Sequence, residues 1–175
     1  MTLLIRLAAS LRGPLADLLA RTREFTADEV EVALELVDAA LAGSRDYRFL
    51  VDVQDALVGE GAAGNLAPTP RGYVCFGRTP MTQGTFDLYW IAVDPAFKGK
   101  GVGRALVSAM EEELAREGAY LVRVETAGAP EYAATRAFYD RIGYEVVARI
   151  RDFYAPGNDL VIYGHYLAPD GAPRH

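Results

Sequence analysis

The sequence predicts one mixed α/β (α+β) domain that spans residues 1–175. Three observations predict it. Helical periodicity appears early, strand-like segments follow, and the second half alternates strand, helix, strand, helix and strand. No internal repeat and no linker-like stretch divides the chain. At 175 residues the chain is long enough to bury one substantial hydrophobic core.

The clearest local signal is the start of a helix at Thr26. Thr26 and Glu29 have the spacing of a capping box, in which each side chain satisfies the other residue's backbone N–H. Phe25 and Val30 occupy the hydrophobic-staple positions, and Gly43 is placed to end the helix. The other expected elements are a short helix from Pro14, helices at about 101–117 and 131–141, a loop over 59–70, and strands at about 3–8, 47–53, 71–77, 85–93, 119–125, 144–151 and 160–167.

Composition and charge exclude several classes of function. The net charge is −6 and the pI is about 5.0, so the chain lacks the excess of Lys and Arg that neutralises nucleic-acid phosphates. An acidic surface favours cationic ligands such as amines. No segment reaches the ~20 apolar residues that span a bilayer, and Arg6 interrupts the short apolar run at the N-terminus. Cys75 is the single cysteine and no metal-ligand spacing is present, so we expect a cytoplasmic protein without a disulfide or a metal site.

The most informative segment is Lys98-Gly99-Lys100-Gly101-Val102-Gly103-Arg104, which lies between a predicted strand and a predicted helix. Glycines at alternate positions leave the backbone uncovered, so that its N–H groups can approach a bound anion closely. The start of the following helix adds unsatisfied N–H groups and a partial positive charge. The segment therefore predicts a phosphate or pyrophosphate site with three basic side chains around it.

Other phosphate-binding motifs fit this turn less well. A P-loop needs a Gly-Lys-Ser/Thr ending, whereas Arg104 and Ala105 follow Gly103. A dinucleotide fingerprint needs a third glycine where Leu106 stands, and in that interpretation Glu125 would be the ribose-binding acid. A plain loop and helix entry without a ligand is the remaining alternative.

Two segments resemble motifs of the GNAT superfamily of N-acetyltransferases. A strand ending in Val93-Asp94-Pro95, followed by Lys98-x-x-Gly101-x-Gly103, resembles motif A, with Lys98 where the family has Gln or Arg. The run Thr135-Arg136-Ala137-Phe138-Tyr139-Asp140-Arg141-Ile142-Gly143-Tyr144 resembles motif B, with Tyr132 where many relatives carry Asn. The resemblance covers about residues 46–167. It implies a central mixed, mostly antiparallel sheet of six to seven strands, splayed between its two central strands and flanked by about four helices.

The resemblance also implies an activity, the transfer of an acetyl group from acetyl-CoA to a primary amine. In the family, backbone N–H groups of the glycine turn hold the pyrophosphate of coenzyme A. By this resemblance, the strand ending at Val93 would splay from its neighbour at 119–125, and its free backbone groups would pair with the pantetheine arm. An unpaired inner strand edge is costly, so a ligand that occupies it makes physical sense. The cofactor-binding residues implied are Ile91, Ala92, Val93, Lys98, Gly99, Lys100, Gly101, Val102, Gly103 and Arg104.

Two residues are implied for the proton transfers. Tyr139 matches the tyrosine that often protonates the leaving thiolate in this family, and a phenol with a pKa of ~10 suits that role. The alternative is a core aromatic. Asp87 lies six residues before Val93, where histone-acetyltransferase-like relatives carry a glutamate, and strand alternation puts it on the face of Ile91. Asp87 is therefore a candidate base, and the alternative is a solvated acid or one that attracts a cationic amine.

Weaker signals concern the acceptor and the partners. His165 is interpreted as structural, and Asp152-Phe153-Tyr154 either packs or lines the acceptor pocket. The implied acceptor is a small-molecule or lysine-like amine, with nucleic acid and membranes excluded as partners. The final strand at 160–167 is expected at an exposed sheet edge, where pairing across a two-fold would give a homodimer. A non-catalytic acyl-CoA-binding or interaction module on the same fold is the alternative to an enzyme.

Overall fold

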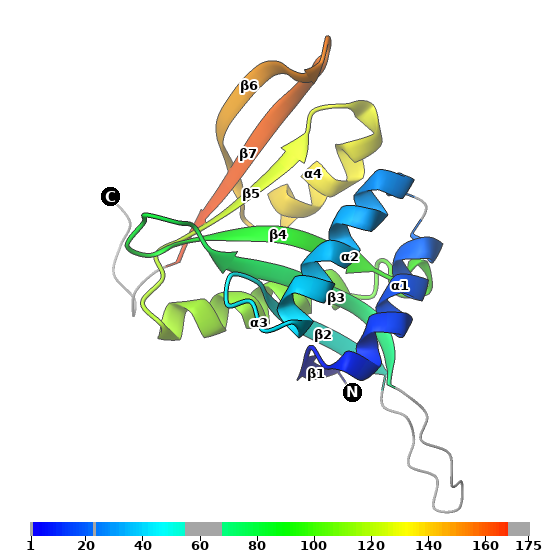
Figure 1. Cartoon of the computed structure of the whole chain (residues 1–175). Coiled ribbons are helices and arrows are strands. Elements are labelled where there is room, and N and C mark those ends of the chain that lie inside the picture. The colour runs from blue at the N-terminus through cyan, green and yellow to red at the C-terminus, as the bar shows by residue number, and fades with distance from the viewer. Residues whose placement is uncertain (1, 23, 55–67, 168–175) are drawn as a thin grey trace, which may run out of the picture. The chain divides into compact units, whose positions relative to one another are not determined.

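The computed structural model describes residues 2–22, 24–54 and 68–167. The four helices are α1 (Arg12–Arg21), α2 (Ala27–Leu41), α3 (Val102–Arg116) and α4 (Ala133–Arg141) (Figure 1). Short 3₁₀ turns come before three of them: Ala9–Leu11 before α1, Pro95–Phe97 before α3 and Pro130–Tyr132 before α4. The seven strands are β1 (Thr2–Arg6), β2 (Arg48–Gln54), β3 (Thr69–Arg78), β4 (Thr85–Val93), β5 (Leu121–Ala127), β6 (Glu145–Ala155) and β7 (Asn158–Tyr166).

The chain divides into two compact units, and strands β3 and β4 each run from one into the other. Unit 1 is Met1–Phe76 with Trp90–Met110, and unit 2 is Gly77–Tyr89 with Glu111–His175. The sheet has the strand order β1-β2-β3-β4-β5-β7-β6. The β4–β5 pair is parallel, whereas the β1–β2, β2–β3, β5–β7 and β6–β7 pairs are antiparallel. The predicted class, a mixed and mostly antiparallel sheet with about four helices, is confirmed.

The parallel ladder between β4 and β5 is short. Its register runs from Thr85 opposite Leu121 to Leu88 opposite Val124, although both strands continue beyond that point. The pairing therefore stops before either strand ends, as the predicted splay of the two central strands requires. From Tyr89 onward, no residue of β4 takes part in this ladder.

One predicted position in the sheet is wrong. The final strand, expected at an exposed edge over 160–167, is β7 and lies between β5 and β6. The edge strand of unit 2 is β6, in which every residue is exposed. A β-hairpin through the Pro156-Gly157 turn fixes β6 beside β7, but periodicity does not show which of the two strands then pairs with β5.

Smaller differences concern the element ends. The first strand spans Thr2–Arg6 rather than 3–8, and the helix expected at 131–141 begins at Ala133 after a 3₁₀ turn. The loop expected over 59–70 lies mostly outside the described residues, and its last two positions, Thr69 and Pro70, already belong to β3.

Helix α2 begins as its capping signal predicts. The Thr26 backbone N–H donates to Glu29 Oε2 at 2.7 Å, and the Glu29 N–H donates to Thr26 Oγ1 at 3.2 Å. Val37 and Ala33 are the buried residues of the helix, and Gly43 follows it with a φ of 95°. The capping box satisfies two backbone donors that the helix itself leaves unpaired.

Replacing Thr26 with Ala should lower the free energy of unfolding by about 1 kcal/mol, because one backbone donor of α2 loses its partner. Thr26→Ser keeps the hydroxyl and should stay close to the wild type. Chemical denaturation of the three proteins checks this. Equal midpoints for the Ala and Ser variants would contradict a stabilising cap.

The core of each unit is built from aliphatic and aromatic side chains. Unit 1 buries Leu15, Leu18, Leu19, Val51, Val53, Tyr73, Phe76, Leu106 and Met110, and unit 2 buries Leu114, Val122, Val124, Tyr139, Tyr144, Val161 and Tyr163. Cys75 on β3 is fully buried, and burial raises the pKa of its thiol. No helix among the described residues is long and apolar enough to cross a membrane.

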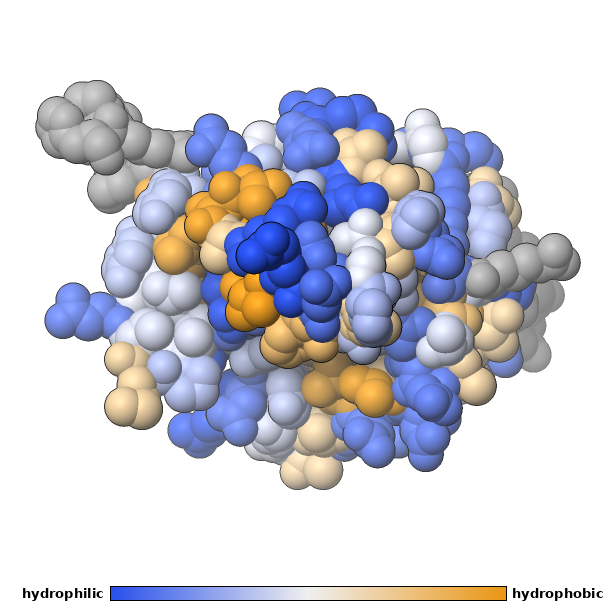
Figure 2. Space-filling model, turned by 90° about the horizontal axis from the view of Figure 1, so that it is seen from above, coloured by the Kyte–Doolittle hydropathy of each residue, from blue (hydrophilic) through white to orange (hydrophobic). Residues whose placement is uncertain are grey.

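Apolar side chains also reach the surface. On the face seen in Figure 2, hydrophobic areas (orange) interrupt a largely hydrophilic surface. The exposed large apolar or aromatic side chains concentrate on β6, which contributes Val146, Val147, Ile150, Phe153 and Tyr154.

Candidate active site

Two positions of the glycine turn have a backbone conformation that favours glycine. Gly99 and Gly101 have φ values of 71° and 82°, in the left-handed region that favours glycine. The first backbone hydrogen bond of α3 runs from the Ala105 N–H to the Gly101 carbonyl at 2.9 Å. The N–H groups of Val102, Gly103 and Arg104 therefore precede the helix's own ladder and can receive an anion.

A buried carboxylate anchors the turn to β4 and α1. Asp94 Oδ1 accepts the Ala96 N–H at 2.9 Å, and the Arg21 guanidinium donates to Asp94 Oδ2 at 2.7 Å. Burial opposes ionisation of Asp94, but these two donors outweigh it, so the pKa of the carboxyl is lowered. The Asp94 N–H also donates to the Arg71 carbonyl at 2.8 Å. The entry to the turn is thus fixed in unit 1, and Arg21 has no sequence signal that identifies it.

The basic side chains of the turn have partners of their own. Lys98 Nζ forms an ion pair with the Glu24 carboxylate, which is separated from it by 74 positions in the chain. Lys100 Nζ lies 5.2 Å from the centroid of the Phe97 ring. Arg104 is exposed in the first turn of α3. The three basic residues therefore belong to the turn or to the start of α3, and the charge of Lys98 is balanced by the Glu24 carboxylate.

The end of β4 is closely packed on one side. Ala92 is buried, whereas Ile91 and Val93 are half-buried. A Cβ atom at Gly72 of β3 would lie 2.8 Å from the Ala92 carbonyl oxygen and 3.0 Å from Val102 Cγ1. Glycine at position 72 is therefore needed for the close packing of β3, β4 and the start of α3.

Trp90 faces a different environment from its neighbours on β4. Its ring packs 5.1 Å from the Phe25 ring, at the entry to α2. Its buried indole Nε1 has no hydrogen-bond partner among the described residues.

In unit 2, Asp87 is held in a polar network. It is 7% exposed, so the alternative of a solvated acid at the strand entry is wrong. Thr79 Oγ1 donates to Asp87 Oδ2 at 2.8 Å, and Arg123 Nε donates to Asp87 Oδ1 at 2.6 Å. Arg123 lies directly opposite Asp87 in the β4–β5 ladder and also contacts Glu125 Oε1 at 3.0 Å through Nη1. The network thus continues along β5 to Glu125. The sequence predicted neither Arg123 nor Glu125 as a partner of Asp87.

Tyr139 lies in an aromatic cluster of unit 2. It is 2% exposed, and its ring centroid lies 5.3 Å from Phe138, 5.5 Å from Tyr144 and 5.6 Å from Tyr163. Burial raises the pKa of the Tyr139 phenol, so the hydroxyl keeps its proton above the pH at which an exposed tyrosine ionises. A protonated phenol is the form that a general acid requires.

The same cluster continues to a buried acid. The Tyr144 hydroxyl donates to Glu111 Oε1 at 2.9 Å, and His165 Nδ1 lies 2.7 Å from the same oxygen. The Tyr144 and His165 rings are 5.0 Å apart. These contacts support the structural interpretation of His165.

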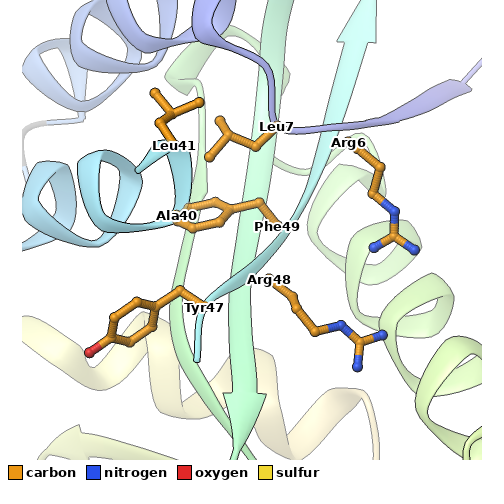
Figure 3. A pocket seen from close by; sticks show the side chains of 7 residues that line it. All are labelled: Arg6, Leu7, Ala40, Leu41, Tyr47, Arg48 and Phe49. Atoms are coloured by element: carbon orange, nitrogen blue, oxygen red, sulfur yellow. The ribbon is translucent and has the colours of Figure 1, made fainter. Parts of the chain in front are cut away.

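A cavity of about 200 Å³ lies elsewhere in unit 1. Figure 3 shows Leu7, Leu41 and Phe49 on one side of it, with the Arg6 and Arg48 side chains extending to the other. It contains none of the predicted site residues. Among the residues that the structure describes, no three His, Cys, Asp or Glu side chains are grouped as a metal site would require.

The predicted site residues thus fall into two groups. Unit 1 holds the glycine turn and the segment Ile91–Val93, and unit 2 holds Asp87 and Tyr139. Within unit 2, Asp87 lies in a polar network and Tyr139 in an aromatic cluster. The residues that the sequence did not assign are Arg21 in unit 1 and Arg123 in unit 2.

Comparison with known proteins gives consistent similarities. A family model described as an acetyltransferase (GNAT) domain matches residues 45–146. A crystal structure of a protein assigned to the GNAT acetyltransferases, from Desulfovibrio desulfuricans, is 34% identical, covers 96% of this chain and 100% of its own, and has a TM-score of 0.86. The N-alpha-acetyltransferase RimI of Mycobacterium tuberculosis is 29% identical over 126 residues, which are 72% of this chain and 75% of RimI. The Salmonella typhimurium protein yncA, solved with acetyl-CoA, is 20% identical, with coverages of 99% and 98% and a TM-score of 0.68.

Proposed function

The chain belongs to the GNAT family of acetyltransferases, and on that premise we propose that it transfers an acetyl group from acetyl-CoA to a primary amine by direct attack. One observation carries the proposal: uncommitted backbone N–H groups at the start of α3 follow a strand whose ladder with β5 stops after four pairs. Pyrophosphate and pantetheine amides are the groups that such a backbone can bind.

The cosubstrate is acetyl-CoA, and the glycine turn supplies its diphosphate site. The residues proposed to hold it are Ile91, Ala92, Val93, Lys98, Gly99, Lys100, Gly101, Val102, Gly103 and Arg104. Backbone N–H groups at Gly99–Arg104 would bind the pyrophosphate, while Ile91–Val93 would pair with the pantetheine arm. The Ile91 N–H would also polarise the thioester carbonyl, as a donor aimed at the developing oxyanion does.

The proposed reaction moves two protons. The amine nitrogen forms a bond to the thioester carbonyl carbon and gives up a proton to a base, for which Asp87 is the candidate. The C–S bond then breaks, and Tyr139 donates its phenolic proton to the leaving sulfur. Tyr139 regains a proton from solvent in the following turnover. Because Asp87 is nearly buried and already accepts from Thr79 and Arg123, we propose that its proton arrives through a water molecule.

Asp87→Asn should lower kcat/KM at neutral pH by about 100-fold, at the low end of what a general base contributes. Activity should return toward the wild-type value at alkaline pH, where the acceptor amine is already neutral. The measurement is a pH–rate profile beside Asp17→Asn, which changes an exposed carboxylate on α1. If Asp87→Asn matches the wild type across neutral and alkaline pH, Asp87 is not the base.

The proposed function is tested by two assays on the purified protein. Calorimetric titration with acetyl-CoA asks whether the cosubstrate binds, and release of free thiol with a panel of primary amines asks whether transfer occurs. Binding with amine-dependent thiol release supports the enzyme. Binding without release for any amine leaves a non-catalytic acyl-CoA-binding module, and no binding at millimolar acetyl-CoA leaves an interaction protein.

The remaining proposals concern organisation. We propose that residues 1–175 form a single domain, because β3 and β4 each contribute to both units. A cytoplasmic location accords with the single, buried cysteine. A homodimer, if formed by strand pairing, would use the edge strand β6 instead of β7.

A further inference from the structure

The strongest unassigned feature of unit 1 is a buried ion pair between β2 and β3. Arg71 Nε donates to Asp52 Oδ1 at 2.5 Å, and the Asp52 side chain is fully buried while that of Arg71 is 16% exposed. Asp52 Oδ2 and Arg71 Nη2 are also buried, and neither atom has a hydrogen-bond partner in the part of the chain that the structure describes. Because the attraction of two buried charges offsets their desolvation only in part, such a pair adds little net stability. Its effect is to hold two strands at one fixed point.

A β-bulge gives Arg71 its direction. In the β2–β3 register, Asp52 lies opposite Gly72 and Val53 lies opposite Pro70, so Arg71 is an extra residue of β3. Pro70 has no N–H group to donate, and proline in a sheet is tolerated at such an irregularity. A bulge bends its strand and changes the direction of a side chain. Here that side chain is the Arg71 guanidinium, which reaches the Asp52 carboxylate on β2.

The bulged residue contacts the entry to the glycine turn. The Arg71 carbonyl accepts the Asp94 N–H at 2.8 Å, and Arg71 Cζ lies 5.8 Å from the centroid of the Phe97 ring. Asp94 caps the 3₁₀ turn that leads to Lys98, and Phe97 is the last residue of that turn. The main chain and the side chain of Arg71 therefore meet the two ends of the segment that carries the chain from β4 into the glycine turn.

The next residue of β3 packs on both sides of the same turn. A Cβ atom at Gly72 would lie 2.8 Å from the Ala92 carbonyl oxygen, 3.0 Å from Val102 Cγ1 and 3.2 Å from Leu106 Cδ1. Ala92 belongs to β4 before the turn, whereas Val102 and Leu106 belong to α3 after it. A shift of the bulge along β3 would therefore move the contacts that hold the glycine turn.

We infer that Asp52 and Arg71 are positioning residues for the cosubstrate. Their ion pair fixes the bulge of β3, and the bulge fixes the glycine turn whose N–H groups bind the pyrophosphate. The inference rests on the proposed function and deepens it, because neither residue is among those proposed to contact acetyl-CoA. Groups that bind a ligand need support from the residues behind them, so loss of the pair should weaken binding although every contacting group remains.

Hydrogen–deuterium exchange, followed by NMR, tests the positioning in the absence of cosubstrate. Asp52→Asn keeps the shape of the side chain and removes its charge. The Asp94 and Ala96 N–H groups, which donate to the Arg71 carbonyl and to Asp94 Oδ1, should then exchange about tenfold faster than in the wild type. The control is Val37→Ala, which removes buried methyl groups from α2 and should change both rates by less than about twofold. Equal changes in the two variants would overturn the inference.

Calorimetric titration with acetyl-CoA tests the consequence for binding. Asp52→Asn and Arg71→Met should each raise the dissociation constant about tenfold. The double variant Asp52→Asn/Arg71→Met contains no unpaired buried charge, so it should be more stable than either single variant and yet bind acetyl-CoA as weakly. Recovery of the wild-type dissociation constant in the double variant would show that an unpaired charge, and not position, caused the loss, and would overturn the inference.

The matched control for binding is Asp38→Asn. Asp38 lies on α2 and accepts from Arg12 at 3.0 and 2.9 Å, so the same chemical change is made at another Asp–Arg pair of unit 1. This variant should keep the wild-type dissociation constant. If Asp52→Asn does not fold, the double variant carries both measurements, because it leaves neither charge unpaired.

The two measurements separate this inference from the proposed function. Absence of wild-type binding at millimolar acetyl-CoA contradicts the proposed function, and the exchange rates of Asp94 and Ala96 then decide whether the ion pair holds the turn. Wild-type binding with an unchanged dissociation constant and unchanged exchange rates in Asp52→Asn overturns the inference alone.

Discussion

Tyr139→Phe should lower kcat by about 1000-fold, within the range that general acid catalysis supplies. The substitution removes one hydroxyl and keeps the ring, so the packing against Phe138, Tyr144 and Tyr163 is retained. The dissociation constant for acetyl-CoA should therefore change by less than about twofold. Since burial raises the pKa of the phenol, the ratio of wild-type to variant rates should remain constant up to about pH 10, the pKa of an exposed tyrosine. A pH–rate profile of both proteins provides the measurement.

The matched control for Tyr139 is Tyr144→Phe. Tyr144 is buried in the same cluster, packs on Tyr139, and donates its hydroxyl to Glu111. Removing that hydroxyl should affect the stability of the protein more than kcat. Equal losses of kcat in the two variants would mean that the cluster as a whole positions the site, and that Tyr139 has no separate role as acid.

Gly101→Glu should weaken acetyl-CoA binding by about 1000-fold, because a carboxylate facing the pyrophosphate costs several kcal/mol and each 1.4 kcal/mol is a factor of ten. A side chain at this position points into open space, so the loss would not come from a steric clash within the protein. Calorimetric titration with acetyl-CoA measures the effect directly.

Gly157→Glu is the control for the backbone. Gly157 has a φ of 81°, close to the 82° of Gly101, and also has nothing within 4 Å of an added Cβ. Replacing either glycine should therefore destabilise the backbone by a similar free energy. Gly157, however, lies in the β6–β7 turn and not in the glycine turn before α3. If Gly157→Glu weakens acetyl-CoA binding as much as Gly101→Glu does, the glycine turn is not the pyrophosphate site.

The features that the sequence predicted well are those encoded over a few residues. The capping box at Thr26 and Glu29, the helix that follows the glycine turn, and the strand Thr85–Val93 each depend on neighbours within one segment. Such patterns specify local hydrogen bonds and backbone angles, so they can be read without knowledge of the tertiary structure.

The features that it did not predict depend on residues far apart in the chain. The partner of Asp94 is Arg21, 73 positions away, and the partner of Asp87 is Arg123, 36 positions away. The second pair exists because β4 and β5 are parallel in one specific register, which periodicity does not determine. The position of β7 inside the sheet was missed for the same reason, since a hairpin fixes which strands pair but not which of them faces β5.

The burial of Cys75 has a practical consequence for enzymology. Reagents that colour on reaction with free thiols attack the thiolate, and this side chain is both inaccessible and reluctant to ionise. It is also the single cysteine of the chain. Folded protein should therefore contribute no background when such a reagent follows coenzyme A release continuously. The same shielding should protect Cys75 from peroxide at concentrations that oxidise exposed cysteines.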